Sequence, residues 1–528
     1  MAPKKSIGKG PGPRGLTDAT KVKALLDESK IRPDALIPLQ SGSALGPVYE
    51  GECSESLEDF YPGDPEHLPF HSIDPVWTEY FKGTPNRLWP KPTPEYNAWF
   101  LRVAEAKGAQ WKRNGLYDII FLSTQEIFLD KGLFYAAAQF WSTRTNSFHF
   151  PCGMMSPTIQ EICMITGLPA HGKDADPFLE LTEPPFEYPD DSKDRSYIAF
   201  PAYYACTTGK VSDREHIAFL IYWLNRYLFC VSSYSVTMDF TPLARALALD
   251  ETYAMAPFVL AYLYRGMYHM LSKEFTFGCG PLWILMIWLW VYFPKFAPTS
   301  NKLPTHSCYG LNFTEVESSA NTFAGCFSFF YTLESMKKGW MPFTRDTVPR
   351  NLLPLESSLD EETNGPEMWK SFLTARDLLY GLSAEAKNSK DGVEYYNPAQ
   401  LARQFGLTQC VPVPPYQSLN ANFGERPTFK LEDLALAKST SFELKNKCQL
   451  MAYAEHPSKT KAFESWWKSY SSKAFAKPLQ EVLLKIQPSK KSRSATTSAP
   501  SNPKRKGIYP FLYDNHPLYC PFFHYLIL

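Results

Sequence analysis

The sequence lacks three features that often indicate a function directly: an excess of charge of one sign, closely spaced cysteines and an apolar leader. Lys and Arg together number 54, as do Asp and Glu, so the 528-residue chain as a whole offers no long-range field to a polyanion. Its 11 cysteines are scattered and odd in number, with no pair at the C-x-x-C spacing. This pattern argues against a zinc knuckle and a closed disulfide framework, so we expect reduced thiols in the cytosol or nucleus.

Segments for secretion or membrane insertion are not predicted either. The first 15 residues are basic and rich in Gly and Pro and have no apolar core, which is not the pattern of a secretory signal. The 20 residues between Glu274 and Lys295 carry no charge, which is near the length that spans a bilayer. Two glycines and Pro281 interrupt the first third of this stretch, so the continuous apolar run covers only 282–293. We therefore predict the central helix of a globular core there, and no membrane contact.

Helical periodicity dominates what is present, with 44% hydrophobic and 15% aromatic residues available for a core. Apolar helices are expected near 215–230, 243–249, 257–271 and 282–292. The predicted fold class is mainly α with minor short β, a multi-helix globular domain with disordered basic tails. The predicted parts are a flexible N-terminal arm (1–70), the helical domain (71–420), a helical extension (421–487) and a basic disordered tail with an anomalous aromatic end (488–528).

Positive charge is concentrated at the two ends of the chain. Residues 1–14 hold four basic residues and residues 485–506 hold seven, with no acid in either stretch, which leaves the remainder at about −11. The second stretch is typical of a bipartite nuclear localisation signal and can also contact phosphates without sequence preference. A purely solubilising tail is an equally open interpretation, and the aromatic end either docks onto the body or is an artefact of the gene model. The candidate residues are Lys490, Lys491, Arg493, Lys504, Arg505 and Lys506.

The most patterned stretch is "FHFPCGMMSPTIQEICMITGLPAHG", residues 148–172. Alternation over 148–152 predicts a short half-buried strand, which Gly153 ends. Ser156 is the expected helix N-cap with Pro157 at the first position, and the capping box is then incomplete because Ile159 stands where Glu or Gln belongs. Gly167 suits a left-handed helix stop. Each special residue thus has a structural role, which favours a fold signature over a catalytic site.

Candidate chemical sites are weak by comparison. A pyridoxal enzyme needs a phosphate cradle in an α/β domain, and no glycine-rich turn follows a strand here. His149 is expected to be a hydrogen-bonded strand residue, and Met154, Met155 and Met164 are expected to pack in the core. The acids that a two-metal transposase would need are ordinary surface or cap residues when taken singly. We therefore predict no enzyme, no cofactor and no metal; the acids considered are Asp118, Asp130, Asp239, Asp250 and Glu251.

Four blocks in a fixed order carry a resemblance to a known family. They are "GLYDIIFLSTQEIFLDKGLFYAAAQFWSTRTNSFHFPCGMMSPTIQEICMITGLPAHG" from residue 115, "FVLAYLYRGMYHML" from 258, "GPLWILMIWLWVYFPKFAP" from 280 and "YNPAQLARQFGLTQCVP" from 396. Over roughly residues 75 to 420 the chain resembles the plant mobile domain, a family once labelled aminotransferase-like that includes maintenance-of-meristems-type proteins. The signature residues, taken as structural, are Gly153, Pro157, Thr158, Thr166, Gly167, Leu168 and Pro169.

The resemblance implies a role rather than a reaction, because the family has no established catalytic residues to transfer. It implies a transposon-derived nuclear protein, otherwise cytoplasmic, that acts in transposable-element silencing, gene expression or meristem integrity with protein partners such as a phosphatase-like protein and chromatin. Two positions depart from the family pattern: Met154 stands where an acid is common, and Phe293 where an arginine is common. A transposition component that binds or cuts DNA, and an inert element copy, remain the alternatives.

Overall fold

The computed structural model describes the greater part of the chain between residues 91 and 486. The described residues are 43–45, 48–49, 91–179, 195–231, 233, 235–271, 280–298, 308–314, 321–336, 342, 370–381, 391–412, 418–420, 426–445, 450–452 and 459–486. The predicted N-terminal arm, apart from two short strands, and the predicted basic tail with its six candidate residues lie outside this set.

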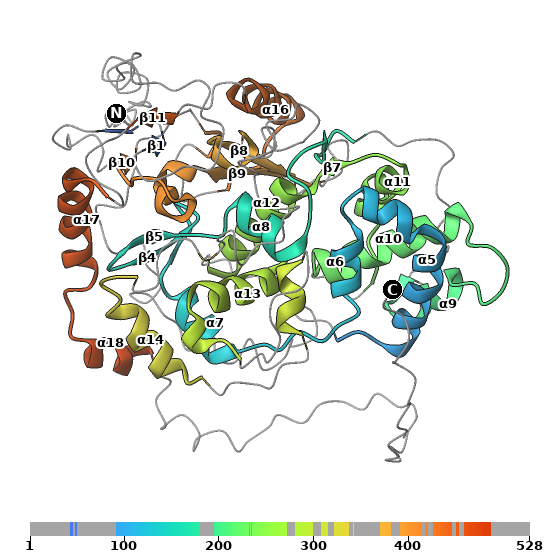
Figure 1. Ribbon diagram of the computed structural model, residues 1–528, viewed down its shortest axis with the longest axis horizontal. Coiled ribbons are helices and arrows are strands. Elements are labelled where there is room, and N and C mark those ends of the chain that lie inside the picture. Colours follow the sequence, from blue (N-terminus) through green and yellow to red (C-terminus); the bar gives the residue numbers. More distant parts are fainter. Residues whose placement is uncertain are drawn as a thin grey trace, which may run out of the picture. The chain divides into compact units, whose positions relative to one another are not determined.

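Helices make up most of the described structure, as predicted for a mainly α fold (Figure 1). The strands are few and two to five residues long. The α-helices are α5 (Pro94–Arg113), α6 (Tyr117–Leu122), α7 (Lys131–Ala138), α8 (Ile159–Thr166), α9 (Ala199–Tyr204), α10 (Asp213–Trp223), α11 (Thr241–Ala248), α12 (Met255–Leu271), α13 (Leu282–Tyr292), α14 (Phe323–Tyr331), α16 (Leu431–Lys445), α17 (Lys461–Ala474) and α18 (Leu479–Ile486).

The remaining elements are short helical turns and small sheets. A π-helix, η5 (Leu224–Leu228), continues α10, and 3-10 helices are η6 (Met238–Phe240), η7 (Pro294–Phe296), η8 (Tyr309–Phe313) and η9 (Pro398–Phe405). The antiparallel sheets are β3 (Trp141–Ser142), β4 (Ser147–Phe150) and β5 (Gly153–Met155); β8 (Arg376–Tyr380) with β9 (Gly392–Tyr396); β1 (Ser43–Leu45) with β11 (Leu450–Ala452); and β2 (Val48–Tyr49) with β10 (Val411–Pro412). Strands β6 (Lys173–Asp174) and β7 (Tyr253–Ala254) pair in parallel.

The predicted core helices are confirmed, and α13 is buried along its whole length. All eleven of its residues are buried, because α13 packs against α8 and α12 in the middle of the core (Figure 1). Pro281 precedes the helix and Pro294 follows it, so the prolines set its length. A search of the described residues finds no helix both long and apolar enough to cross a bilayer. The uncharged run is therefore a core helix, as predicted.

The strand prediction for residues 148–152 was wrong in two respects. Gly153 does not end the β structure; with φ of 137° it begins β5, which pairs with β4. Nor is β4 half-buried, since all four of its residues are buried. The polar side of the alternation is covered from outside: the rings of Trp467 and Tyr470 of α17 lie 5.5 and 5.4 Å from the ring of His149. The alternating pattern thus reflects two different buried environments rather than a solvent face.

The N-cap of α8 was predicted two residues too early. Thr158, rather than Ser156, caps the helix, and its side chain accepts a hydrogen bond from Gln160 N. Glu161 completes the capping box that the sequence analysis took to be incomplete. Ser156 is engaged elsewhere, because its hydroxyl donates to Asn146 O at 2.6 Å. The predicted stop is confirmed: Gly167 adopts the left-handed conformation with φ of 77°.

Helices α17 and α18, within the predicted extension, contribute to the same hydrophobic core as the preceding domain. The indole N–H of Trp467 donates to the carbonyl oxygens of Phe150 and Pro151 at 3.1 Å each, which ties α17 to the β4–β5 turn. Helix α14 packs against both α7 and α18. The described residues up to Ile486 accordingly belong to one compact unit.

Candidate functional site

The signature residues lie around the start and end of α8, where their contacts are structural. Tyr264 of α12 donates its hydroxyl to Pro157 O at 2.7 Å. Thr166 donates its hydroxyl to Ile162 O and accepts from Leu168 N, which closes the last turn of the helix. Beyond the turn, Pro169 O accepts a hydrogen bond from Ala256 N at the start of α12. These contacts join α8 to α12 and do not converge on a pocket.

Glu161 is the centre of a buried polar network that connects three of the four motif blocks. One carboxylate oxygen accepts from the hydroxyl of Tyr292 at 2.5 Å and from Nε2 of Gln404 at 3.2 Å. The other accepts from the backbone N–H of Thr158 at 2.8 Å and from its hydroxyl. Burial raises the pKa of this carboxyl, although all four hydrogen bonds favour the charged form. Four hydrogen-bond donors hold this carboxyl group in place. We therefore assign Glu161 a structural role.

A second buried cluster joins β9 to the turn before β4. Arg426 and Glu394 form an ion pair at 2.8 Å whose side chains are 1% and 0% exposed. Asn146, at a left-handed φ of 49°, donates its side-chain amide to Glu394 and accepts from Arg426 through its side-chain oxygen. The guanidinium of Arg426 also lies 4.6 Å from the ring centre of Tyr268 of α12. The buried charges of Arg426 and Glu394 are thus compensated by each other and by neighbouring side chains of the protein.

The glycine of the motif, Gly153, makes room for a buried arginine from the last block. A Cβ at this position would lie 1.9 Å from a guanidinium nitrogen of Arg403. That guanidinium donates to Cys152 O through both terminal nitrogens at 3.2 Å, and burial lowers its pKa to about 10. The signature residues and their partners therefore hold the blocks together.

The remaining predicted residues occupy separate places. His149 bonds Thr145 through one ring nitrogen and Tyr470 through the other, both at 2.8 Å, which confirms a hydrogen-bonded strand histidine. The three methionines are buried in the core, as predicted. Asp130 caps α7, whereas Asp250 and Glu251 form surface ion pairs with Arg113 and Lys173. Among the described residues, no group of three His, Cys, Asp or Glu side chains converges as a metal site would require.

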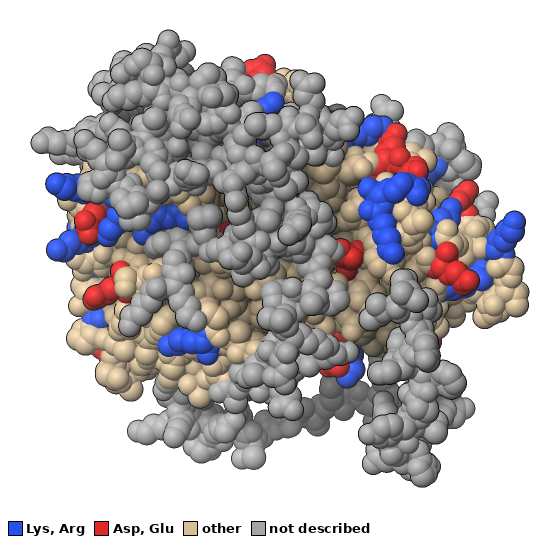
Figure 2. All heavy atoms as spheres, viewed as in Figure 1, with Lys and Arg blue, Asp and Glu red and all other residues tan. Residues whose placement is uncertain are grey.

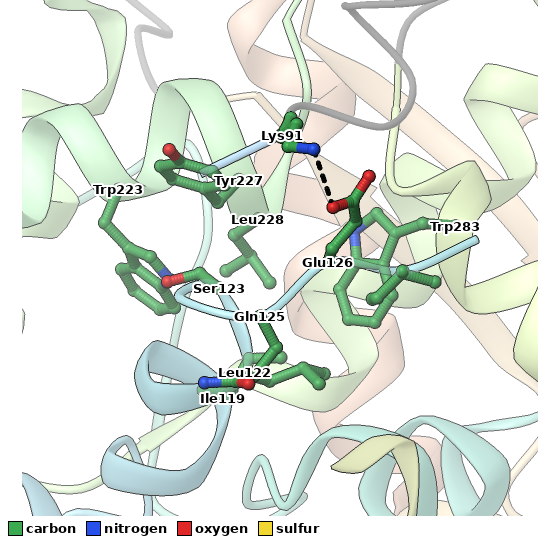
Figure 3. A pocket seen from close by; sticks show the side chains of 11 residues that line it. Lys91, Ile119, Leu122, Ser123, Gln125, Glu126, Trp223, Tyr227, Leu228 and Trp283 are labelled. Atoms are coloured by element: carbon green, nitrogen blue, oxygen red, sulfur yellow. Dashed lines mark ion pairs between the residues drawn. The ribbon is translucent and has the colours of Figure 1, made fainter. Parts of the chain in front are cut away.

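A pocket of about 70 Å³ lies elsewhere, between α6, the α10–η5 junction and the first turn of α13 (Figure 3). Its apolar lining comes from Ile119, Leu122, Ile127 and Leu228 together with the rings of two tryptophans. Trp223 is the last residue of α10 and Trp283 is the second residue of α13, and they face each other across the pocket (Figure 3). The other lining residues are Lys91, Ser123, Gln125, Glu126 and Tyr227.

The pocket wall is formed where the helix changes its hydrogen-bonding pattern. The π-helix η5 begins directly after Trp223 and supplies Tyr227 and Leu228 to the lining. Just beyond it, Cys230 adopts a left-handed φ of 45°, which is uncommon for a residue other than glycine. Single π-helical turns are frequent at functional sites because the wider turn redirects side chains. The local backbone is thus built to present these side chains to the pocket.

The polar groups of the pocket are two indole N–H groups in its walls and an ion pair at its rim. The indole N–H groups of Trp223 and Trp283 are buried and have no acceptor, although the residues are only 0% and 5% exposed. At the rim, Lys91 and Glu126 form an ion pair at 2.9 Å with side chains 72% and 63% exposed. The hydroxyl of Ser123 is already engaged, since it donates to Ile120 O at 2.5 Å. Neither indole N–H is exposed to the pocket, so its interior is apolar, and its rim is neutral overall.

Sequence analysis did not predict this pocket. Its members come from four separated segments, and Lys91 precedes the first described helix. The only signal in the sequence is the unusual concentration of tryptophan in apolar helices, which core packing alone also explains. Neither the π-helix nor the orphaned indole N–H groups can be derived from residue periodicity.

Charge over the described surface is mixed rather than of one sign. On the face shown in Figure 2, basic and acidic side chains are interspersed over the region of α5, α10 and α11. Helix α5 forms ion pairs with exposed acids, Lys107–Asp213 at 3.0 Å and Arg113–Asp250 at 2.8 Å. Lysines that are paired in this way offer little net attraction to nucleic acid. The predicted sequence-blind contact with phosphates concerns the basic tail, which lies outside the described residues.

The fold and the site define a helical domain whose described part contains buried polar networks and a small pocket. The model of the family "Plant mobile domain" matches residues 115–468, and the chain belongs to this family. This confirms the resemblance inferred from the four sequence blocks. No solved structure matches the chain.

Three curated proteins of Arabidopsis thaliana are similar to the chain. Protein MAIN-LIKE 2 is 26% identical over 54% of this chain and 43% of its own length, and Protein MAINTENANCE OF MERISTEMS is 25% identical over 55% and 60%. A serine/threonine-protein phosphatase 7 long form homolog is 23% identical over 57% of this chain and 23% of its own length. The chain thus matches from about a quarter to three fifths of the length of these relatives.

Proposed function

We propose that this chain is a non-enzymatic interaction module of the plant mobile domain family. The observation that carries the proposal is the composition of the pocket. Among the described residues that line it there is no His, Cys or Asp, and its one acid, Glu126, is exposed and paired with Lys91. Nucleophilic and acid–base catalysis need a positioned base next to the reacting group. Apolar walls suit recognition instead.

The cellular role we propose is a nuclear one, in the silencing of transposable elements, in gene expression or in meristem development. Two relatives support this direction through their names, one of which refers to the maintenance of meristems. The third relative combines a similar region with a phosphatase name, which supports a phosphatase-like protein as a partner class. The basic tail would direct nuclear entry and add salt-sensitive contact with chromatin.

Purification of the tagged full-length protein from plant nuclear extract, with and without nuclease, tests this function. We expect protein partners, including a phosphatase-like or chromatin protein, that remain after nuclease treatment. Recovery of nuclease-sensitive chromatin alone would support the alternative, a transposition component bound to DNA. Exclusion of the tagged protein from nuclei would contradict the proposed location.

A further inference from the structure

Helix α17 and the turn that follows it carry lysines that the fold does not neutralise. Residues 459–486 hold six lysines and two glutamates. Glu464 already pairs with Lys459 at 2.8 Å. Glu481 likewise pairs with Lys485 at 3.0 Å. This leaves the lysine row, four exposed side chains without an acidic partner among the described residues: Lys461, Lys468, Lys473 and Lys477.

The inner face of α17 is anchored in the hydrophobic core, so its outer face has a fixed position. The buried residues of the helix recur every three or four positions: Phe463, Trp467, Tyr470 and Ala474. The outward line of the helix alternates lysine and serine at the same helical spacing, and all of its members are exposed: Lys461, Ser465, Lys468 and Ser472. Figure 1 places α17 at the left edge, and Figure 2 shows basic side chains projecting along that edge.

We infer that the lysine row is a surface for the phosphate backbone of double-stranded DNA. Ammonium and hydroxyl groups both donate to phosphate oxygens, and such contacts position a protein on a duplex without reading its sequence. From Lys461 to Lys473 the helix rises by about 18 Å, a length over which duplex DNA carries on the order of ten phosphates. The choice of DNA over RNA alone rests on the proposed nuclear role.

The composition of the outward line favours a nucleic acid over a protein partner. Protein interfaces depend on buried aromatic or aliphatic anchors and are depleted in lysine, whereas interfaces with DNA are polar and strongly basic. The line of Lys461, Ser465, Lys468 and Ser472 contains no apolar residue. A polar, positively charged line of this kind therefore fits a polyanion.

The aromatic side chains of α17 favour a duplex over a single strand. Proteins that bind single strands stack the bases on accessible aromatic rings. Trp467 is only 5% exposed, and its indole N–H is bonded to the backbone of Phe150 and Pro151. The ring of Trp466 packs on that of Trp467, with 5.7 Å between the ring centres. These rings serve the core, which leaves backbone contact as the function of the outer face.

The sequence continues the positive charge beyond α18. Residues 485–506 hold seven basic residues and no acid. The lysine row and the basic tail are therefore neighbours in the sequence and attract the same kind of ligand. The row differs from the tail because a folded helix holds its charges in place, so it would fix where on the domain the DNA lies.

The test measures binding of the full-length protein to a fluorescein-labelled DNA duplex of about 20 base pairs by fluorescence anisotropy, between about 50 and 200 mM salt. The row variant combines Lys461→Gln, Lys468→Gln, Lys473→Gln and Lys477→Gln. Its plot of log K against log salt concentration should be shallower by about 3, because each lost phosphate contact removes about 0.9 from the slope. Its affinity at about 100 mM salt should fall at least tenfold. Glutamine matches lysine in helix propensity, so α17 should still form.

A charge-matched control separates the position of the lysines from net charge. It removes four charges from exposed lysines elsewhere, by Lys112→Gln, Lys173→Gln, Lys210→Gln and Lys430→Gln. The slope should then change by less than about 1 and the affinity by less than about threefold. Should the row variant fail to fold, as judged by its thermal unfolding, Lys461→Gln with Lys468→Gln carries the same test, with an expected change in slope of about 1.5–2.

Each outcome decides the proposal. Equal losses in the row variant and the control, or an unchanged slope in the row variant, would overturn it, because net charge or the tail would then explain the binding. Tighter binding of single-stranded DNA or of poly-glutamate than of the duplex would also overturn it. Duplex RNA that binds at least about fivefold more tightly than the DNA would assign the surface to RNA. Purified components suffice for every readout, so the proposed nuclear role and its protein partners can fail independently.

Discussion

The hydroxyl of Tyr292, the last residue of α13, donates a hydrogen bond to the buried carboxylate of Glu161 on α8, with 2.5 Å between the oxygens. Both residues belong to sequence blocks that are separated by more than a hundred positions. The same carboxylate oxygen accepts from Gln404 of η9, so one acid holds three elements. All of these partners donate to it, so the side chain at this position acts as a hydrogen-bond acceptor.

Replacement of Glu161 by Gln should destabilise the protein by about 1–3 kcal/mol, because the new amide N–H faces donors. The effect should depend on pH. Burial raises the folded-state pKa of Glu161 above its unfolded value, so its stabilising contribution is present below about 4.3 and declines as the pH rises towards the folded value. Urea unfolding at pH 4.5, 6 and 7 measures this. The advantage of wild type over Glu161→Gln should be greatest at pH 4.5.

Glu105 of α5 provides the control for this change, because it is exposed and forms none of the hydrogen bonds of the Glu161 network. Glu105→Gln should alter the free energy of unfolding by less than about 0.5 kcal/mol at every pH. A difference between wild type and Glu161→Gln that is constant or grows with pH would contradict the assignment.

A methyl group at residue 153 should be strongly destabilising. In Gly153→Ala the Cβ would collide with the guanidinium of Arg403, which is buried and cannot simply move into solvent, and φ of 137° is unfavourable for alanine. We expect a loss of about 2–4 kcal/mol in the free energy of unfolding. Gly209→Ala isolates the backbone part, because its φ is 77° and nothing lies within 4 Å of the added Cβ; about 1 kcal/mol is expected. Equal losses of unfolding free energy in the two variants would show that the Arg403 side chain moves away from the added methyl group at little cost.

Removal of one partner of the buried ion pair should cost far more than removal of a surface partner. Arg426→Met leaves the carboxylate of Glu394 buried without its cation, and we expect a loss of about 3–5 kcal/mol. Arg113→Met, which breaks the exposed pair with Asp250, should cost less than about 1 kcal/mol. Guanidinium chloride unfolding of the two variants compares them directly. A loss of unfolding free energy below about 1 kcal/mol for Arg426→Met would contradict this, because the carboxylate of Glu394 would then have found another partner, such as water.

His216 of α10 should make the protein sensitive to acid. Its Nε2 accepts a hydrogen bond from the indole N–H of Trp111 at 2.9 Å, which requires the neutral ring, and burial lowers its pKa to about 3. A depressed histidine pKa stabilises the fold above the unfolded value of about 6.5 and loses that contribution as the pH falls towards the folded value. Between about pH 5.5 and 4 the slope from this group should approach about 1.4 kcal/mol per pH unit, and His216→Gln should remove it. An unchanged slope in the variant would assign the acid sensitivity to other groups.

Much of the fold followed from the sequence where local signals were strong. The apolar run bounded by Pro281 and Pro294 predicted α13, and Gly167 predicted the end of α8, because both depend on properties of single residues. The N-cap of α8 was misplaced because Ser156 and Thr158 have the same local propensity, and only the distant partner Asn146 decides between them. The burial of His149 in turn depends on α17, more than 300 residues further on.

The pocket was beyond prediction from sequence for a related reason. Its walls depend on the positions of Trp223 and Trp283, and the π-helix after Trp223 supplies Tyr227 and Leu228 to the lining. Lys91 and Glu126 show no special feature in the sequence, although they form an ion pair at the rim of the pocket. The periodicity of the sequence does not predict that these two residues form an ion pair. The roles of signature residues such as Gly167 could be predicted, by contrast, because these residues determine the conformation of the adjacent backbone.

The central claim is that the chain acts by recognising a protein partner. The most direct measurement compares the nuclease-resistant proteins recovered from plant nuclear extract with the tagged full-length protein and with the tag alone. We predict a set of partners that is present with the full-length protein and absent with the tag alone. The same proteins with both, or no nuclease-resistant partner with the full-length protein, would contradict the account.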